Sequence, residues 1–359
     1  MKNNLFILLL FLCATYFISC NKEDQNSVDD DGNASLWVSL YDGEKGSSKF
    51  KDNNCYIYRD GHLLYTYPFL SEVVRNGTDV YALVREGESY VWNYSIWKNG
   101  KRLYGLDSEG GLPPDYGGGC DLYVVKNDVY SCGTEDIFES DGKIKSHKGI
   151  VWKNEKALFE LESRGSTIWP NWIFVEGSDI YVAGAVLDSE TREKGPAVWK
   201  NGKLTFVGKD YKKGSGWNHM YDIKCYYGDL YYAGSWCNEG DGGHHARIWK
   251  NNTILYDLAG EHNWAYVYRM AFNDGCLYAV GFNQAGNGVL WKNGETMWEI
   301  KETQQMSIVL IGGDIYTAGI VGTSIGGIGT DRLAQIWKNG EVFQTFDYCQ
   351  VVELIESCK

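Results

Sequence analysis

The sequence predicts an all-β protein, a seven-bladed β-propeller of four-stranded antiparallel blades that is closed by its C-terminal strand. Trp-Lys-Asn recurs six times at intervals of about 45 residues, which is the length of one blade. An Asp-x-Tyr or Cys-x-Tyr triplet precedes each copy. The chain also holds 43 Gly, 14 Trp and 26 Tyr residues, a composition typical of short strands and tight turns. The motif aromatic residues are Tyr58, Trp97, Trp152, Trp199, Trp249, Trp291 and Trp337.

The composition limits the possible functions. Of the 359 residues, 44% are hydrophobic, so most of the chain can bury a core and disorder is excluded for it. Lys and Arg number 34 against 47 Asp and Glu, which gives a net charge of -13. Binding to nucleic acid requires clustered cationic side chains, so a nucleic-acid partner is not expected.

The first element is an export signal. Lys2 precedes an apolar run from Leu5 to Ile18 that is too short for a stable membrane span. The run ends in Phe-Ile-Ser-Cys, which resembles a bacterial lipobox. We therefore expect residues 1–19 to be a lipoprotein signal peptide and Cys20 to be lipidated. The alternative is an ordinary signal peptide with an incidental cysteine.

The second element is a tether. Residues 20–34 are polar and acidic, and we expect them to be disordered between the lipid and the folded part. Lys22-Glu23-Asp24 resembles the acidic signal that directs some Gram-negative lipoproteins to the cell surface. We therefore expect attachment to the outer membrane through the lipid alone, with the protein exposed at the cell surface; a periplasmic location is the alternative.

Each repeat can then be read as four strands. In the unit from Ile173 to Val207, the expected strands are residues 173–175, 180–185, 197–199 and 204–206. Residues 176–179 form the first turn. Asn201-Gly202 forms the second, because this dipeptide supplies the two positive φ angles of a type I′ hairpin turn.

The two ends of the chain supply the seventh blade. Six complete units cover about residues 72 to 346. Residues 36–41, 55–59 and 62–67 match the second, third and fourth strands of a unit, and residues 350–355 match a first strand. Pairing these strands would close the ring and remove its open edge. The propeller domain is therefore expected over residues 35–359. A six-bladed ring with a loose N-terminal extension is the alternative.

These motifs resemble those of propeller-forming bacterial lipoproteins with Trp-Lys-Asn-Gly repeats. The resemblance covers nearly all of residues 35–359. It implies the fold and the lipid anchor. It implies no activity, because the repeated residues indicate the fold and carry no information on function. The motif Trp residues are expected to pack between blades, and the recurrent Asp to bond its own backbone in a turn.

The candidate ligand site is on the face that carries the long connections between strands, because function concentrates on loops held by a rigid scaffold. These loops carry aromatic and histidine side chains that suit stacking on sugar rings or docking of a protein partner. The alternative is that they only pack the loops onto the body. The ligand-binding candidates are Tyr116, Trp169, Trp217, His219, Trp236, His262 and Trp264. Aromatic residues twelve before each turn also include Tyr67.

No catalytic residue is assigned, and neither a metal nor a cofactor is expected, because motifs for metal, phosphate or nucleophile chemistry are missing from the sequence. Binding of a glycan or an envelope protein is the preferred function. An extracellular glycan-active hydrolase or lyase that uses two carboxylates is the alternative, and a purely structural envelope module is a third. Cys120 and Cys132 flank one hairpin and are the candidate disulfide.

Overall fold

The computed structural model describes most of the predicted propeller. The described residues are 35–43, 50–86, 93–106, 121–138, 144–164, 167–187, 194–208, 218–236, 244–258, 264–322, 333–347 and 349–355. The predicted signal peptide over residues 1–19, the lipidated Cys20 and the tether over residues 20–34 lie outside this set. Among the described residues, no helix is long and apolar enough to cross a bilayer.

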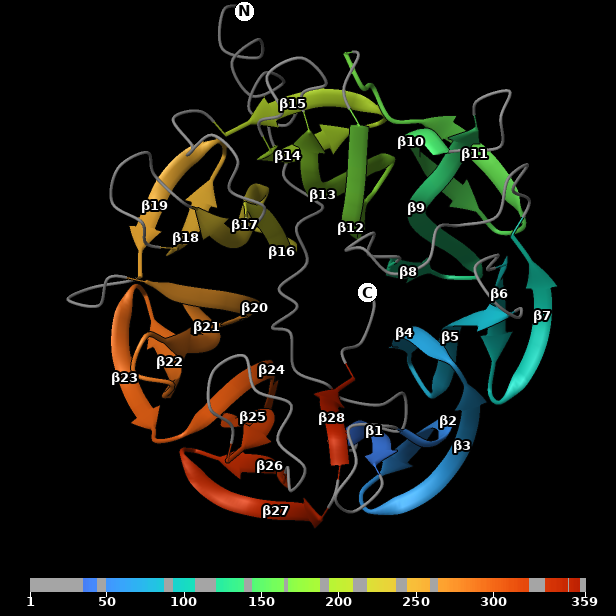
Figure 1. Ribbon diagram of the computed structural model, residues 1–359. Helices are drawn as coiled ribbons and strands as arrows, with labels where there is room; N and C mark the ends of the chain where they lie inside the picture. The colour runs from blue at the N-terminus through green and yellow to red at the C-terminus, as the bar shows by residue number, and fades with distance from the viewer. Residues whose placement is uncertain are drawn as a thin grey trace, which may run out of the picture.

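Seven four-stranded antiparallel sheets form a ring, as predicted (Figure 1). The inner strands of blades 1 to 7 are β28 (Cys349–Leu354), β4 (Leu70–Asn76), β8 (Asp121–Val125), β12 (Thr167–Glu176), β16 (His219–Tyr226), β20 (Ala265–Asn273) and β24 (Thr303–Ile311). The second strands are β1 (Trp37–Gly43), β5 (Asp79–Glu86), β9 (Asp128–Phe138), β13 (Asp179–Leu187), β17 (Asp229–Trp236), β21 (Cys276–Asn283) and β25 (Asp314–Val321).

The third strand carries the Trp-Lys motif in six blades and Tyr58-Arg59 in blade 1, and the fourth strand forms the outer rim. The third strands are β2 (Phe50–Arg59), β6 (Asn93–Lys98), β10 (Ile144–Lys153), β14 (Lys194–Lys200), β18 (His245–Lys250), β22 (Gly288–Lys292) and β26 (Leu333–Lys338). The fourth strands are β3 (His62–Pro68), β7 (Lys101–Gly105), β11 (Lys156–Glu160), β15 (Lys203–Val207), β19 (Thr253–Asp257), β23 (Glu295–Ile300) and β27 (Glu341–Asp347).

The C-terminal strand closes the ring. β28 pairs antiparallel with β1, with Val38 opposite Leu354, and the sheet order of blade 1 is β28-β1-β2-β3. The predicted seven-bladed closure is confirmed, and the six-bladed alternative is wrong. Because β28 and β1 come from opposite ends of the chain, the inner strand of this blade is joined to the rest of the sheet by noncovalent contacts alone.

The blades present two different faces. Two-residue turns join strands 1 and 2 and strands 3 and 4, and in an antiparallel blade these connections share one face, here called the short-turn face. The turns are residues 60–61, 77–78, 99–100, 126–127, 154–155, 177–178, 201–202, 227–228, 251–252, 274–275, 293–294, 312–313 and 339–340. The other connections share the opposite, long-loop face. Two of them are nonetheless short, because Phe69 alone joins β3 to β4 and residues 301–302 join β23 to β24.

The repeated Asp, Lys and Asn form the same hydrogen-bonded network in blades 2, 3, 4, 5 and 7. In blade 4, Asn201 donates to Asp179 at 2.9 Å and accepts from the N–H of Ile180 at 2.8 Å, while Lys200 pairs with Asp179 at 2.7 Å. The expectation that the Asp bonds its own backbone is therefore wrong, since its carboxylate ties the two turns of the blade together. Blades 2, 3, 5 and 7 have the same Asp–Asn and Asp–Lys pairs. In blade 6, Cys276 replaces the Asp.

The Asn-Gly pairs have the predicted turn geometry and a packing role. In six of the seven described turns between strands 3 and 4, both turn residues have positive φ, as a type I′ turn requires. The outer-strand aromatic ring of the preceding blade also lies against this turn. A Cβ at Gly294 would come within 2.4 Å of the Tyr256 ring. Glycine therefore provides both the φ angle and the space.

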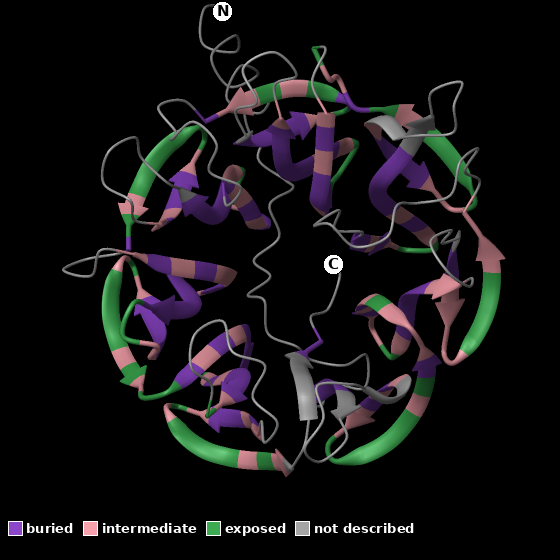
Figure 2. Cartoon of the chain, in the orientation of Figure 1, coloured by how far each residue is buried: buried purple, intermediate pink, exposed green. Residues whose placement is uncertain are grey.

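The core lies between neighbouring blades (Figure 2). Trp152 of blade 3 packs with Leu83 and Ile96 of blade 2, and Trp199 of blade 4 packs with Val151 of blade 3. Trp249 and Trp291 make the corresponding contacts. The predicted packing role of the motif Trp is confirmed, and it leaves the inner strands to form the wall of a central channel.

Candidate functional site at the central channel

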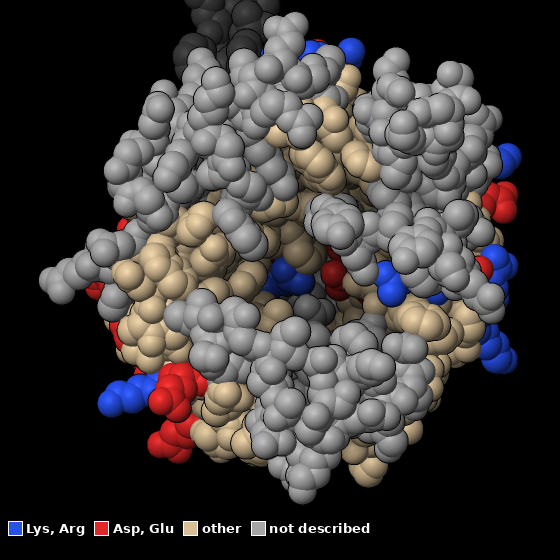
Figure 3. All heavy atoms as spheres, in the orientation of Figure 1, with Lys and Arg blue, Asp and Glu red and all other residues tan. Residues whose placement is uncertain are grey.

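The seven inner strands enclose a small chamber on the channel axis. It has a volume of about 70 Å³ and is lined by side chains from every blade. Five of the lining residues are charged, namely Glu72, Asp121, Asp222, Lys224 and Arg269. Figure 3 shows both cationic and acidic atoms at the bottom of the central hollow.

Most of the charged wall residues occupy one repeated position. Glu72, Asp121, Trp172, Asp222, Arg269 and Ser307 each lie seven residues before the Asp or Cys that opens the second strand of their blade. In blades 2, 4, 5, 6 and 7 a register shift directly precedes this residue, which marks a β-bulge. Bulges redirect side chains next to functional sites, and this position lines the chamber in all six blades.

Two of the wall carboxylates tie blades together. Asp121 accepts from the N–H of Leu122 at 2.8 Å and from the N–H of Ile173 in the next blade at 2.7 Å. Asp222 does the same with Ile223 at 2.8 Å and Met270 at 2.7 Å. In blade 7, the hydroxyl of Ser307 accepts from the N–H of Leu354 at 2.9 Å and so links blade 7 to blade 1.

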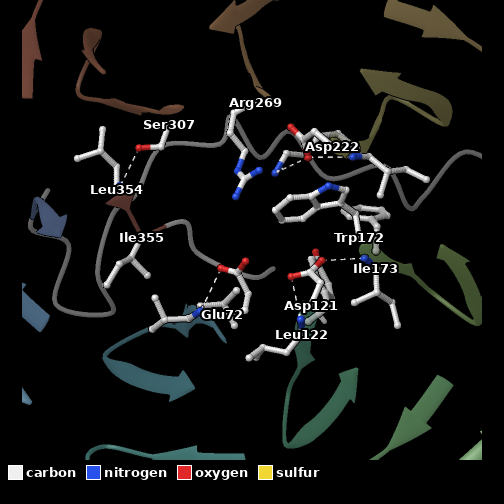
Figure 4. Close-up of a pocket in the computed structure, with 16 residues that line it drawn as sticks. Glu72, Asp121, Leu122, Trp172, Ile173, Asp222, Arg269, Ser307, Leu354 and Ile355 are labelled. Carbon is white, nitrogen blue, oxygen red and sulfur yellow. Dashed lines mark hydrogen bonds and ion pairs between the residues drawn. The ribbon is translucent and has the colours of Figure 1, made fainter. Parts of the chain in front are cut away.

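The cationic groups of the chamber have defined orientations. The guanidinium of Arg269 lies 3.8 Å from the centre of the Trp172 ring, a cation–π contact. Its Nη1 donates to the carbonyls of Tyr221 at 3.2 Å and Tyr268 at 3.4 Å. Lys224 lies 3.6 Å from the carboxylate of Asp222. Figure 4 shows the guanidinium directed into the chamber beside Trp172, with Asp121 and Glu72 across from it.

Burial shifts the protonation of Asp121. Removal from water raises the pKa of this carboxyl to about 7, although the N–H of Ile173 and the positive charge of Arg269 both act to lower it. Asp121 therefore carries only part of a negative charge near neutral pH. The Nε1–H of Trp172 is buried at the same wall and has no hydrogen-bond partner among the residues that the structure describes.

Aromatic side chains precede the chamber on the same strands, toward the long-loop face. We call His219, Tyr221, Trp264, Tyr266 and Tyr268 the mouth cluster. All five are partly exposed, and they come from the first halves of β16 and β20 or from the residue before β20. The centres of the Tyr221 and Tyr268 rings are 5.4 Å apart, and those of Tyr266 and Tyr268 are 6.4 Å apart.

The rings of the mouth cluster are held by contacts with one another and with Phe282 and His244. Tyr266 stacks on Phe282 at 5.0 Å and on His244 at 5.5 Å, and Trp264 meets Tyr266 edge-on at 5.7 Å. Burial raises the pKa of the Tyr268 and Tyr221 phenols, which therefore stay neutral hydrogen-bonding groups. The cluster is a fixed apolar and hydrogen-bonding surface beside a charged chamber.

The structure describes the side chains of three of the predicted ligand-binding residues. His219 and Trp264 belong to the mouth cluster. Trp169 lies on β12, with its ring 6.3 Å from that of His147. Asn171, two residues later, donates to the carbonyl of Met220 at 3.1 Å and so joins blade 4 to blade 5. Tyr116, Trp217 and His262 lie outside the described residues, and of Trp236 only the backbone at the end of β17 is described.

Two further expectations concern residues of other blades. Tyr67 is not at the channel mouth, because it is fully buried in β3 and its hydroxyl accepts from the N–H of Gly100 at 3.0 Å. Burial raises the pKa of Tyr67 to about 12. Cys132 is buried in β9 opposite Asp121, and Cys120 lies outside the described residues, so their disulfide stays a prediction.

The motifs in the sequence did not predict the chamber. Asp121, Asp222, Lys224 and Arg269 were not among the predicted site residues. The signal is visible when the repeats are aligned on the Asp-x-Tyr triplet. The seventh residue before the triplet is polar or aromatic in each of six repeats, within an otherwise largely apolar strand. Among the described residues, no group of three or more His, Cys, Asp or Glu side chains could hold a metal ion.

Comparison with known proteins adds the fold alone. No family model and no curated protein matches the sequence. The β-propeller domain of the Trilobed protease from Pyrococcus furiosus, described as having an open velcro topology, is 13% identical with a TM-score of 0.51. That match covers 87% of this chain and 92% of the domain. In this chain, by contrast, β28 closes the ring.

Two other solved structures are similar. The acylaminoacyl peptidase of Pyrococcus horikoshii is 13% identical over 88% of this chain, with a TM-score of 0.53. This chain spans about half of it, 51%. Hydrazine synthase of Kuenenia stuttgartiensis is 8% identical over 74% of this chain and 86% of its own, with a TM-score of 0.50. Identities this low show that the propeller fold is shared and do not transfer an activity.

Proposed function

We propose that this protein is a lipid-anchored, extracytoplasmic glycan-binding protein whose ligand docks at the mouth of the central channel. The observation that carries the proposal is the mouth cluster, in which five partly exposed aromatic and histidine side chains adjoin a polar chamber. Sugar rings have flat apolar faces edged by hydroxyls. Such ligands are bound by fixed aromatic faces with a few convergent polar groups beside them.

The place where the described chain joins the propeller bears on which face a lipid anchor would hold toward the membrane. The N–H of Asp60, in a turn of the short-turn face, donates to the carbonyl of Leu36 at 2.9 Å. The described chain therefore begins at the face opposite the mouth cluster. A lipid on Cys20 would hold the short-turn face nearer to the membrane and leave the mouth directed away from it. Multiple acyl chains make such an anchor stable.

The hydrolase or lyase alternative has less support from the chamber. Asp121 and Asp222 lie in it, but each carboxylate already accepts two backbone N–H groups from its own and the next blade. Ser307 at the same repeated position also accepts an N–H of the next blade, that of Leu354, so this position links neighbouring blades in three places. The pairs Asp115 with Glu261 and Asp241 with Asp331, considered from the sequence, lie outside the described residues.

Binding is tested on a broad glycan array with the chain lacking residues 1–20. We expect a defined set of glycans to bind, and binding to fall at least tenfold in a Trp264→Ala/Tyr266→Ala double variant that retains its unfolding transition. The matched control is Tyr227→Asn, which removes an exposed aromatic ring from the short-turn face. Equal binding by the double variant, or no binding by the unchanged chain, would contradict the proposal.

Anchoring is tested separately in a Gram-negative host. The full chain is expressed with an alkyne-labelled fatty acid, and we expect label to be incorporated and to be lost in Cys20→Ser. Protease treatment of intact cells then reports the location, since a surface-exposed chain is digested and a periplasmic one is protected. Absence of label from the unchanged chain would show that Cys20 is not a lipidation site.

A further inference from the structure

The junction between blades 7 and 1 lacks a packing ring that the other six junctions have. In six blades, an aromatic residue of the outer strand pairs with the residue just before the motif aromatic. These outer-strand residues are Tyr65, Tyr104, Phe159, Phe206, Tyr256 and Trp298. Each of them packs against the core of the next blade. In blade 7 the same register position, opposite Ile336, is occupied by Gln344.

The blade 1 side of this junction is also less filled. Its third strand has Tyr58 at the position of the motif Trp. A Cβ at Gly61, in the turn that follows, would meet no atom within 4 Å. In four other blades the Cβ of the equivalent glycine would meet the outer-strand ring of the preceding blade, at Gly100, Gly202, Gly294 and Gly340. Both blades therefore leave space at the place where the ring closes.

The space between these blades is a largely apolar pocket of about 330 Å³. Its described lining comes from β1 and the residue before it, from the end of β2 with its turn, and from β27. The lining side chains are Leu36, Val38, Leu40, Tyr58, Asp60, Phe343, Gln344 and Phe346. Phe343 is 51% exposed, so it lies on the open side of the pocket. An apolar cavity of about 150 Å³ binds benzene, and this pocket therefore has room for one or two aromatic rings.

The two polar side chains of the pocket favour a neutral ligand. Asp60 accepts from the N–H of Leu36 at 2.8 Å, and its carboxylate would repel an anionic ligand. Its other carboxylate oxygen lies 3.9 Å from the guanidinium of Arg59, so the charge that would attract a cation is already paired. A charged group also loses hydration at high cost when it enters apolar surroundings. The carboxamide of Gln344 can both donate and accept a hydrogen bond.

We propose that the pocket between blades 7 and 1 is a binding site for a small neutral aromatic molecule, an indole or a phenol. The bound ring takes the place that an outer-strand aromatic side chain fills at the other six junctions, and it packs against Val38, Tyr58 and Phe346. Its N–H or O–H bonds the carboxamide of Gln344. Because only noncovalent contacts join the two ends of the chain in blade 1, a ligand held between β27 and β1 also stabilises the closed ring.

Binding is tested by fluorine NMR of a fluoroindole mixed with the chain lacking residues 1–20. We expect saturable broadening of the fluorine signal, and a higher thermal unfolding midpoint of the chain when the fluoroindole is present. Indole should displace the probe. Indole acetate and tryptamine carry a negative and a positive charge on the same ring system, and each should displace it at least tenfold less well.

The position of the site is tested by filling it. Gln344→Trp supplies the ring that Trp298 supplies at the junction before it, where the indole lies against Gly340. We expect this variant to lose fluoroindole binding and to unfold at a higher temperature, because the new side chain fills the pocket. Gln344→Tyr, which matches Tyr65, is the companion variant and should do the same. The control is Val342→Trp, which adds an indole at an exposed position of β27 outside the pocket and should leave binding unchanged.

Three results would overturn the proposal. If the folded, unchanged chain does not bind the fluoroindole, the pocket is a packing gap and not a ligand site, even where Gln344→Trp is more stable. If the two aromatic variants bind the probe as tightly as the unchanged chain does, the ligand lies elsewhere. Equal displacement by indole and its charged analogues would contradict the neutral ligand class. None of these results affects the glycan proposal, because the pocket and the mouth cluster share no residue.

Discussion

At the scale of single residues, Asp121 shows how a structural tie acquires a pH-dependent charge. Its carboxylate joins the N–H groups of two inner strands, yet burial raises its pKa to about 7. The unfolded chain holds the same proton with a pKa near 4. Between pH 4 and pH 7 the folded chain therefore binds more protons than the unfolded chain, and the free energy of unfolding falls as the pH rises.

The first prediction follows from this fall of the unfolding free energy with rising pH. Raising the pH from 4 to 8 should lower the contribution of Asp121 to the free energy of unfolding by at most about 4 kcal/mol, and the contribution should level off above about pH 8. Urea unfolding of the unchanged chain and of Asp121→Asn at several pH values measures the difference. Asn presents one acceptor to two N–H donors, so the variant should be less stable by about 1–3 kcal/mol at pH 7. Parallel pH profiles of the two chains would contradict the assignment.

A second prediction concerns blade 6, in which the Asp of the Asp–Lys–Asn network is missing. Cys276 stands where five other blades have Asp, so Lys292 and Asn293 have no carboxylate at that position. Hydrogen bonds from Lys200 and then Asn201 hold the pKa of the equivalent Asp179 below its usual value, which means that the folded state favours the charged form. Cys276→Asp should therefore raise the thermal unfolding midpoint slightly. The control is Cys276→Ser, which lacks the charge and should not raise it.

At the scale of elements, the third strands hold neighbouring blades together through their Trp residues. Trp199 on β14 is fully buried against blade 3, and its Nε1–H donates to the carbonyl of Glu162 at 3.0 Å. Trp199→Ala should lower the free energy of unfolding by about 3–5 kcal/mol because it opens a cavity between blades. Met297→Ala, on the exposed side of β23, should change it by no more than about 0.5 kcal/mol. If a denaturant titration showed similar losses of unfolding free energy in the two variants, the packing of Trp199 between blades would not be the stabilising contact.

β28 is the element on which ring closure depends. Truncation after Asp347 removes β28, the strand that pairs with β1. It also removes the hydrogen bond that the N–H of Leu354 donates to the hydroxyl of Ser307. We expect the shortened chain to unfold at a clearly lower temperature and to aggregate, since the unpaired edge of β1 can pair with another chain. Removal of residues 356–359 alone serves as the control in differential scanning calorimetry. An unchanged unfolding midpoint after the longer truncation would contradict the role of β28.

At the scale of the whole molecule, the sequence predicted the ring better than the site. The Trp-Lys-Asn and Asp-x-Tyr motifs could be read because each residue performs the same task in every blade, from the φ angles of Asn201-Gly202 to the packing of Trp199. The wall position could not be read in this way, because its occupants change from Glu72 to Trp172 to Arg269. The side chains at this repeated position differ in charge from blade to blade. That they all line one central chamber becomes apparent only in the closed ring.

The mouth residues were predicted in part for a related reason. His219 and Trp264 stand out in the sequence because they follow long polar connections, whereas Tyr221 and Tyr268 resemble ordinary strand residues. Only the bulges in β16 and β20 and the adjacency of blades 5 and 6 bring these two rings to 5.4 Å. Contacts between blades depend on three-dimensional arrangement, which the spacing of motifs within one repeat does not encode.

The central claim is that a glycan binds at the channel mouth, and amide hydrogen exchange of the chain with and without a bound oligosaccharide tests it most directly. The oligosaccharide is the tightest binder from the array. We predict that exchange slows in peptides covering residues 219–224 and 264–270, while the turns of the short-turn face and the outer strands stay unchanged. Protection confined to the short-turn face or to the outer strands, with none at β16 and β20, would contradict the account.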